Sequence, residues 1–371
     1  MNKIFEKGGK LYWLHSTVDA FETFLHVPGT VTLKGSHVRD AIDLKRLLIL
    51  VVIAAAPAAL FGMWNVGYQH GLAMGQTGVH ILEYFWFGFL KVLPLYLVSY
   101  IVGLGIEFAS SQIRGEEVSE GYLVSGFFIP LIVPVDIPLW MLAVAVAFAV
   151  IFGKEVFGGT GMNIWNPALL TRAFLFFSYP NYMSGSDCWI AFKKGETAVA
   201  DAFTGATPLA LDGPAQYGTG FWDLFIGTVP GSVGETSVIA ILLGAILLLW
   251  TGIASWKIMA GSVLGALLVG WIGNVAGITD IPFYMQLLYG GFAFGTVFMA
   301  TDPVTSCQTE CGKWIYGILI GMLCITVRLF NPGYAEGMML AILLLNTFAP
   351  LIDHCVTSVH ISRRAKKFNA A

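Results

Sequence analysis

Long apolar runs separated by short polar turns make up most of the chain beyond residue 46. Only helices and closed barrels satisfy their backbone polar groups in hydrocarbon, and a helix needs roughly 20 apolar residues to cross it. The pattern therefore predicts an all-α polytopic membrane protein with about ten transmembrane helices. The expected spans are residues 47–65, 81–105, 121–134, 136–153, 163–179, 236–253, 257–273, 281–299, 313–329 and 334–352.

Polar intervals between these spans define the expected organisation of the chain. A leader precedes the first span, a long polar loop separates two transmembrane halves, and a short tail follows. In chain order these regions are residues 1–46, 47–179, 180–235, 236–352 and 353–371. The leader has no short apolar stretch followed by a cleavage site, so it is predicted to be a cytoplasmic or interfacial segment and not a signal peptide.

The composition excludes an ordinary soluble globule. Hydrophobic residues make up 56% of the 371 positions and charged residues only 12%, with a mean hydropathy of +0.74. Soluble domains carry about 25% charged residues. The five cysteines include no CxxC pair and the seven histidines are scattered, so no metal or haem site is expected. Nothing in the pattern resembles a hydrolytic triad or a nucleic-acid patch.

Basic residues in the short loops predict the orientation. If the N-terminus is inside, the inside loops carry one basic residue each and the tail carries several, whereas the opposite side has few. This is the positive-inside pattern, so both termini are predicted to be cytoplasmic and the long loop at 180–235 periplasmic. The inside residues are Arg114, Lys154, Lys257, Lys313, Arg363, Arg364, Lys366 and Lys367.

Two Asn-Pro pairs raise the question of an internal repeat. Asn166-Pro167 follows the fourth expected span and Asn331-Pro332 follows the ninth. An odd number of spans in each half would place the second half upside down, as in the inverted repeats of transporters. Alternatively, each Asn-Pro pair is simply a favourable helix start. Both interpretations stay open at this point.

A glycine-rich loop at 153–167 precedes the fifth span. Its glycines allow close backbone approach, and the N-terminus of the following helix offers free N–H groups. Asn163 and Asn166 lie three residues apart and could present donors and acceptors to one ligand edge. The alternative is a re-entrant turn whose asparagines only cap the backbone. Since no Gly-Lys-Ser/Thr follows the glycines, nucleotide hydrolysis is not expected.

A second polar motif, at 227–237, lies ahead of the sixth span. Glu235, Thr236 and Ser237 would fall in the first helical turn. One interpretation is a capped helix start, for which serine and a nearby carboxylate are typical. The other is that these hydroxyls and amides hold a flavin or phosphate edge.

Ionisable side chains at membrane depth are costly and therefore mark functional candidates. Asp302 precedes a proline at the end of a span, where it either caps a turn or serves function. Arg172 and Lys91 are the cations within apolar spans, and pairing inside the bundle is expected for Arg172. The same reasoning singles out five further carboxylates: Glu107, Glu120, Asp136, Glu336 and Asp353.

Thr207 lies in the turn-rich stretch Asp201-Ala-Phe-Thr-Gly-Ala-Thr-Pro-Leu-Ala210. Such residues are ordinary turn formers. A threonine hydroxyl is a poor nucleophile without an adjacent base, and none is near in sequence. Attachment of a group to Thr207 would therefore require a separate enzyme that reads the surrounding residues, for which Asp201 is a candidate recognition feature.

Asp201 to Thr207, as Asp-x-x-Thr-Gly-Ala-Thr, resembles the flavinylation motif of the NqrB/RnfD family. The resemblance covers essentially the whole chain and includes the segments Ser-His-Val-Arg-Asp (36–40), Asp-Leu-Lys-Arg (43–46), Gly-Lys-Glu-Val-Phe-Gly-Gly-Thr-Gly (153–161), Asn-Pro-Ala-Leu (166–169), Pro-Gly-Ser-Val-Gly-Glu-Thr-Ser (230–237) and Ala-Thr-Asp-Pro-Val-Thr-Ser (300–306). In that family FMN is joined through its phosphate to the last threonine. The resemblance therefore implies covalent FMN on Thr207, within a motif that includes Gly205 and Ala206.

The resemblance also implies a second, non-covalent flavin and a quinone substrate. Riboflavin is expected near Asn163 and Asn166, and a flavin edge near the 235–237 motif. Ubiquinone is expected at the inside surface near Glu120, Gly121 and Gly126. For the ion path, Asp353 is the first candidate carboxylate and Glu120 the second.

The implied activity is that of a translocase in the bacterial inner membrane, which relays electrons through flavins to ubiquinone and couples this to Na⁺ export. The long leader favours the branch found in Na⁺-translocating NADH:ubiquinone oxidoreductases. Expected partners are the other subunits of that complex, including a second FMN-bearing subunit and an NADH-oxidising subunit, with membrane lipid and a periplasmic flavin transferase, and no nucleic acid.

Two alternatives remain beside this interpretation. One is the Rnf-type relative, the RnfD component of a ferredoxin:NAD oxidoreductase. The other is a flavin-free secondary transporter with inverted repeats, in which Asp302 and Asp353 serve as ion ligands.

Overall fold

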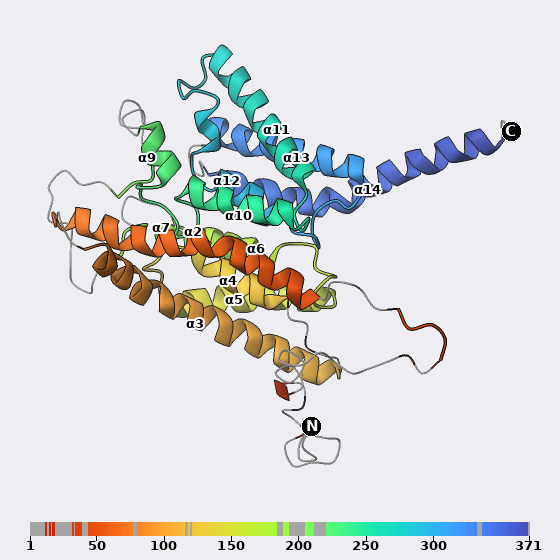
Figure 1. The fold of residues 1–371 in the computed structure, drawn as a ribbon, viewed down its shortest axis with the longest axis horizontal. Coiled ribbons are helices and arrows are strands. Elements are labelled where there is room, and N and C mark those ends of the chain that lie inside the picture. Colours follow the sequence, from red (N-terminus) through yellow and green to blue (C-terminus); the bar gives the residue numbers. More distant parts are fainter. Residues whose placement is uncertain are drawn as a thin grey trace.

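The structure is a computed structural model, and it is all helical over the part of the chain that it describes. That part comprises residues 12, 15, 17–18, 32, 34–38, 44–76, 80–115, 118, 121–183, 188–192, 205–210, 220–331 and 336–369. No strand occurs within these ranges, which confirms the expected fold class. Most of the long helices run in roughly the same direction through the molecule (Figure 1).

Within the described residues, six helical stretches are long and apolar enough to cross a membrane. They lie in α2 (Leu44–Ala73), α3 (Ile81–Arg114), α5 (Leu139–Gly153) together with the short helix that follows it, α11 (Trp256–Val275), α13 (Glu310–Phe330) and α14 (Met338–Asn369). Three apolar helices are shorter, namely α4 (Tyr122–Ile132), α6 (Pro167–Ser178) and α10 (Val238–Trp250). The remaining pieces are η2 (Glu155–Phe157), α7 (Pro180–Met183), α9 (Phe221–Ile226), η3 (Met285–Leu287), α12 (Phe292–Phe294) and the π-helix η4 (Gly295–Met299). Ten crossings therefore stay a prediction.

The short helices end where the local sequence stops them. Helix α4 has 11 residues, about 17 Å at 1.5 Å per residue, and it ends because Val133 before Pro134 takes an extended conformation, φ −105° and ψ 156°. The expected span 281–299 is divided into η3, α12 and η4, with a turn at Gly290, whose φ is +57°. The expected span 163–179 begins as a helix only at Pro167. With 12 residues, α6 covers somewhat more than half of the hydrocarbon core, at about 18 Å of roughly 30 Å.

Each half has a short helix near the junction, α4 in the first and α12 in the second. Phe128 on α4 precedes Asp136 by eight residues, and Phe294 on α12 precedes Asp302 by the same number. The rings of Phe128 and Phe294 meet edge to face at 5.8 Å between centroids. The two short helices therefore meet in the middle of the molecule, while the inverted symmetry itself stays a prediction.

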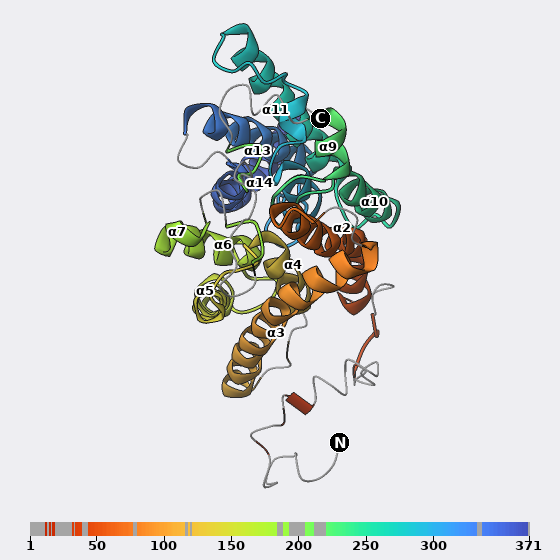
Figure 2. The same cartoon turned by 90° about the vertical axis from the view of Figure 1, so that its left-hand side faces the viewer.

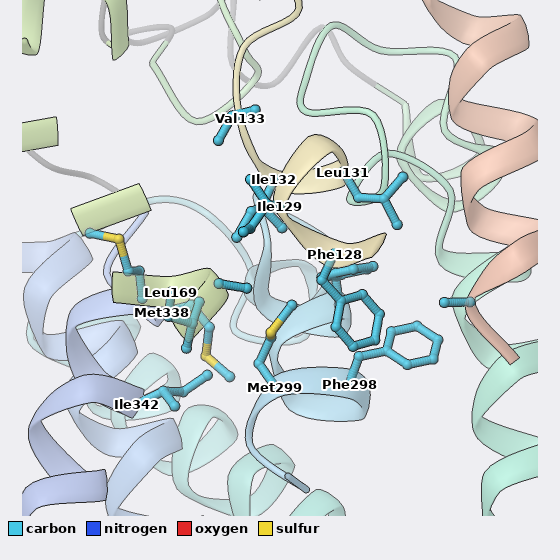
Figure 3. Packing of buried hydrophobic residues seen from close by; sticks show 14 of the residues in the cluster. Phe128, Ile129, Leu131, Ile132, Val133, Leu169, Phe298, Met299, Met338 and Ile342 are labelled. Carbon is cyan, nitrogen blue, oxygen red and sulfur yellow. The ribbon is translucent and has the colours of Figure 1, made fainter. Parts of the chain in front are cut away.

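The core fills the junction of the two halves. In Figure 2, α3 and α5 lie in the lower part and α11 and α13 in the upper part, with α2, α4, α6 and α7 at middle height. Helix α2 packs on α10, and α6 on α14. Phe128 and Ile129 of α4 face Phe298 and Met299 of η4 in Figure 3, in a cluster of buried apolar side chains. Large exposed hydrophobic residues lie on the outer surfaces of the bundle, including Trp86, Ile101, Trp250 and Trp271, as expected for lipid-facing helices.

Helices α11 and α13 pack most closely, through small residues. A Cβ on Gly321 would lie 2.0 Å from the carbonyl oxygen of Ser262, and one on Gly265 would lie 2.2 Å from that of Ile318. Gly261 and Gly317 stand one turn before these glycines on their own helices. This is the small-residue contact that allows membrane helices to approach backbone to backbone.

Candidate functional site

A cavity of about 100 Å³, part of it open to solvent, lies where the two halves meet at the beginning of α2. Its wall is mostly apolar with a few polar groups, the usual composition of a cofactor pocket. The lining residues are Leu47, Leu48, Val51, Gly121, Val124, Ser125, Phe128, Lys154, Thr160, Asn163, Asn166, Pro167, Leu248, Ile253, Ala254, Phe298, Thr301, Asp302, Pro303 and Val304.

Both asparagines of the glycine-rich loop line this cavity, and both also hold the backbone. The Oδ1 of Asn166 accepts from the N–H groups of Ala168 at 3.0 Å and Leu169 at 3.4 Å, which caps α6. The Nδ2 of Asn163 donates to the Trp165 carbonyl at 3.1 Å. Asn166 therefore caps α6, and the same side chain is part of the cavity wall, so both interpretations of this loop stay predictions.

Asp302 forms the opposite wall and is satisfied by local hydrogen bonds. It accepts from the Val304 N–H at 3.2 Å, the Thr305 hydroxyl at 2.9 Å and the Asn166 amide at 3.3 Å. Burial raises the pKa of the Asp302 carboxyl, and these hydrogen bonds act in the opposite direction. The bond to Asn166 joins the second half of the bundle to the start of α6, so it fixes the shape of the cavity.

Of the residues expected at a quinone site, Gly121 lines the cavity and Gly126 lies beside it. A Cβ on Gly121 would come within 2.4 Å of the Thr160 side chain, so glycine lets the start of α4 approach the glycine-rich loop. Gly126 packs on the rings of Tyr100 and Tyr122. Glu120 lies outside the described residues.

Asp353, the first ion-path candidate, caps the start of α13. Its carboxylate accepts from the N–H of Gln308 at 2.7 Å, and from the N–H and hydroxyl of Thr309 at 3.0 and 2.6 Å. Because residues 302–304 line the cavity and Thr309 follows shortly after, Asp353 lies at the cavity end of the bundle.

Thr207 lies in a tight turn at the other end. The Ala210 N–H donates to the Thr207 carbonyl at 2.8 Å, and the Thr207 side chain is half-buried. Leu209 packs on a small apolar cluster that contains Leu224 and Tyr289. Gly205 and Ala206 precede the turn and are buried and half-buried, while Asp201 lies outside the described residues.

Glu235 belongs to a buried charged cluster near this turn, formed with Arg172 and Glu336. Arg172 of α6 donates to the Glu235 and Glu336 carboxylates, both at 2.5 Å, so the expected pairing of Arg172 inside the bundle is confirmed. Ser237 accepts from the Ala240 N–H at 3.4 Å and caps α10. The Thr236 hydroxyl is buried without a hydrogen-bond partner among the described residues.

Two adjacent glycines join the Thr207 turn to this cluster. A Cβ on Gly290 would lie 3.2 Å from the Leu209 side chain and 3.5 Å from the Arg328 guanidinium. A Cβ on Gly291 would lie 2.6 Å from the Glu235 carboxylate. The turn and the charged cluster thus contact neighbouring residues of one loop.

Helix α2 connects the two sites. Val51 lines the cavity near its beginning, whereas the Asn65 amide donates to the Val229 carbonyl at 2.9 Å in the loop beneath the Thr207 turn. The fourteen positions between Val51 and Asn65 correspond to about 21 Å along the helix. The cavity and the turn therefore lie at opposite ends of the bundle.

The pairing of Glu107 with Lys154 was not predicted from the sequence. The two side chains are 2% and 3% exposed and form an ion pair beside the cavity. Lys154 directly follows an apolar span and Glu107 lies near the end of another, which could have suggested the pair. Lys91 likewise pairs with Asp136, at 2.9 Å.

The fold and its two sites define a polytopic helical membrane protein with a partly open, mostly apolar cavity at one end and a turn with a half-buried threonine at the other. Residues 31–362 match the model of the NQR2, RnfD, RnfE family, and the chain belongs to that family. It is 45% identical to the B-subunit of the Na(+)-translocating NADH-quinone reductase of Ectopseudomonas mendocina, over 97% of this chain and 96% of the relative. It is 43% identical to the proteins of the same name from Stutzerimonas stutzeri and Azotobacter vinelandii, with the same coverage.

Proposed function

We propose that this chain is the NqrB-type membrane subunit of a Na⁺-translocating NADH:ubiquinone oxidoreductase. The observation that carries the proposal is the match of 97% of the chain to relatives with that name, at 42–45% identity. The family model also covers RnfD proteins, but the curated relatives favour the NADH-quinone reductase branch over the Rnf branch. NADH oxidation belongs to another subunit, because no dinucleotide-binding fold occurs in the described ranges.

Thr207 carries FMN through a phosphoester bond in this proposal. The turn presents a half-buried hydroxyl at one end of the bundle, where a transferase can reach it. The Arg328 guanidinium lies on the other side of Gly290 and supplies positive charge near the phosphate. Arg328 is fixed by donating to the carbonyls of Gln286 at 2.6 Å and Tyr289 at 2.8 Å.

Riboflavin occupies the cavity in this proposal. The chemistry of the lining would suit a flat heteroaromatic ring, because it combines apolar side chains of both halves with amide and hydroxyl groups. Asn163, Asn166 and Thr160 supply those polar groups, and the ring supplies electron-transfer chemistry when bound. Ubiquinone is placed beside Gly121 and Gly126, so its site adjoins the flavin cavity.

The cavity end is cytoplasmic and the Thr207 end periplasmic in this proposal. The basic residues at the starts and ends of α3, α11 and α13 lie at the cavity end: Arg114 pairs with Glu155, while Lys257 and Lys313 both pair with Glu310. This distribution supports the positive-inside orientation. Electrons would cross between flavins on opposite faces, and Asp353, with Glu120 second, would serve the Na⁺ path on the cytoplasmic side.

In-gel fluorescence tests the flavin attachment. Wild-type protein, produced with its flavin transferase and denatured, should fluoresce under ultraviolet light, and Thr207→Ala should abolish the signal. Thr251→Ala, at the end of α10, is the matched control and should fluoresce like the wild type. A dark wild-type band would refute the proposal and favour the flavin-free transporter.

A further inference from the structure

The Lys154–Glu107 pair is a buried ion pair beside the cavity. Lys154 follows the last residue of α5, and Glu107 lies on α3, about two turns before the helix ends at Arg114. Both side chains are almost fully removed from solvent, at 3% and 2% exposure. An unpaired charge at this depth is strongly unfavourable, so each group depends on the other.

The pair is asymmetric with respect to the cavity. Lys154 lines it, whereas Glu107 is not among the lining residues. An ammonium can donate three hydrogen bonds, and the one described for Lys154 goes to Glu107 Oε1. The Oε2 atom of Glu107 is buried without a partner among the described residues. The ammonium therefore has donor capacity beyond its bond to Glu107, and Lys154 is part of the cavity wall.

The other charged groups nearby are engaged elsewhere. Arg114 pairs with Glu155 at 3.3 Å, and Ser110 donates to the same carboxylate. Across the cavity, Asp302 is held by its local hydrogen bonds. Among the described residues that line the cavity, Lys154 is the one cation.

Two further features hold the positive charge in place. The Lys154 ammonium lies 6.0 Å from the centroid of the Tyr122 ring, and the Tyr122 hydroxyl donates to the Ser99 carbonyl at 3.0 Å, which fixes that ring. Helix α4 begins at the cavity, where Gly121 provides no side-chain cap for its first N–H groups. The partial positive charge of this helix end adds to that of Lys154.

We propose that Lys154 donates a hydrogen bond to a carbonyl-type oxygen of the electron-accepting ring in the cavity and raises the midpoint potential of that ring, while Glu107 holds the ammonium and limits the effect. This inference rests on the proposed function, which places a flavin in the cavity. Adding one electron puts one negative charge on the ring, and the ammonium stabilises that charge while no bond forms or breaks. Lys154 is therefore a binding and potential-setting residue of the inner site.

Spectroelectrochemical titration of the purified complex tests the inference. Lys154→Gln should disfavour the one-electron-reduced form of the non-covalent flavin by tenfold or more, a drop in midpoint potential of at least about 59 mV. Lys154→Arg keeps the charge and should stay near the wild-type potential. The double variant Lys154→Gln/Glu107→Gln leaves no unpaired buried charge, so it should fold well and show a smaller drop of the same sign.

The covalent flavin is an internal control, because it lies at the other end of the bundle and its potential should not move. An unchanged potential of the non-covalent flavin in both the single Gln variant and the double variant would overturn the inference. So would an equal drop in Lys154→Arg. A wild-type complex without any acid-extractable flavin would instead contradict the proposed occupant of the cavity, so the two failures can be distinguished.

Discussion

Replacing Arg172 should destabilise the bundle strongly, because its guanidinium pairs with two buried carboxylates. Arg172 is 4% exposed, and its partners Glu235 and Glu336 are 10% and 16% exposed. At an effective dielectric constant near 20, a pair of charges about 4 Å apart gains about 4 kcal/mol. In Arg172→Gln both pairs are lost and the two carboxylates face each other. Removing one partner of a buried pair typically costs about 3–5 kcal/mol, and we expect a loss in that range.

The assay is thermal unfolding of the detergent-solubilised protein, followed by tryptophan fluorescence. A loss of about 3 kcal/mol corresponds to a drop in apparent melting temperature of roughly 4 °C for a chain of this size. The triple variant Arg172→Gln/Glu235→Gln/Glu336→Gln removes the uncompensated charge and should recover part of the loss. A melting temperature of Arg172→Gln within error of wild type would refute the assignment of this cluster as a stabilising buried ion-pair network.

Two further perturbations test the packing and the ion path. Gly321→Leu should separate α11 from α13, since even a Cβ would lie 2.0 Å from the Ser262 carbonyl, and we expect poor yield and a lower melting temperature. Gly105→Ala, with nothing within 4 Å of the added Cβ, is its control and should behave like the wild type. Asp353→Asn keeps an oxygen acceptor for Thr309, so its stability should fall by only about 1 kcal/mol. Sodium uptake into vesicles that contain the Asp353→Asn variant should nevertheless fall several-fold. Unchanged uptake would show that Asp353 only caps the start of α13 and does not belong to the ion path.

Hydropathy predicted where the helices lie because the bilayer imposes one strong constraint on composition. The residues at which the helices end were harder to predict from the sequence. Pro134 could have indicated the early end of α4, since the residue before a proline avoids the helical region. The break at Gly290 depends on the close approach of Leu209 and Arg328, which comes from distant parts of the chain.

The candidate site residues likewise fall into those that the sequence predicted and those that it did not. The glycine-rich loop, Thr207 and Arg172 were recognisable from residue type and spacing, because each places an unusual group in an apolar or turn-rich context. Their partners were not, since Glu235 and Glu336 lie 63 and 164 residues from Arg172 in sequence. Long-range pairings of this kind depend on how the helices pack, and one sequence contains no direct signal of that packing.

Mass spectrometry of the peptide that contains Thr207 tests the central claim most directly. Protein produced with its flavin transferase should yield this peptide with the added mass of FMN less one water, and fragmentation should place the addition on Thr207. An unmodified peptide, or an addition on a different residue, would contradict the account.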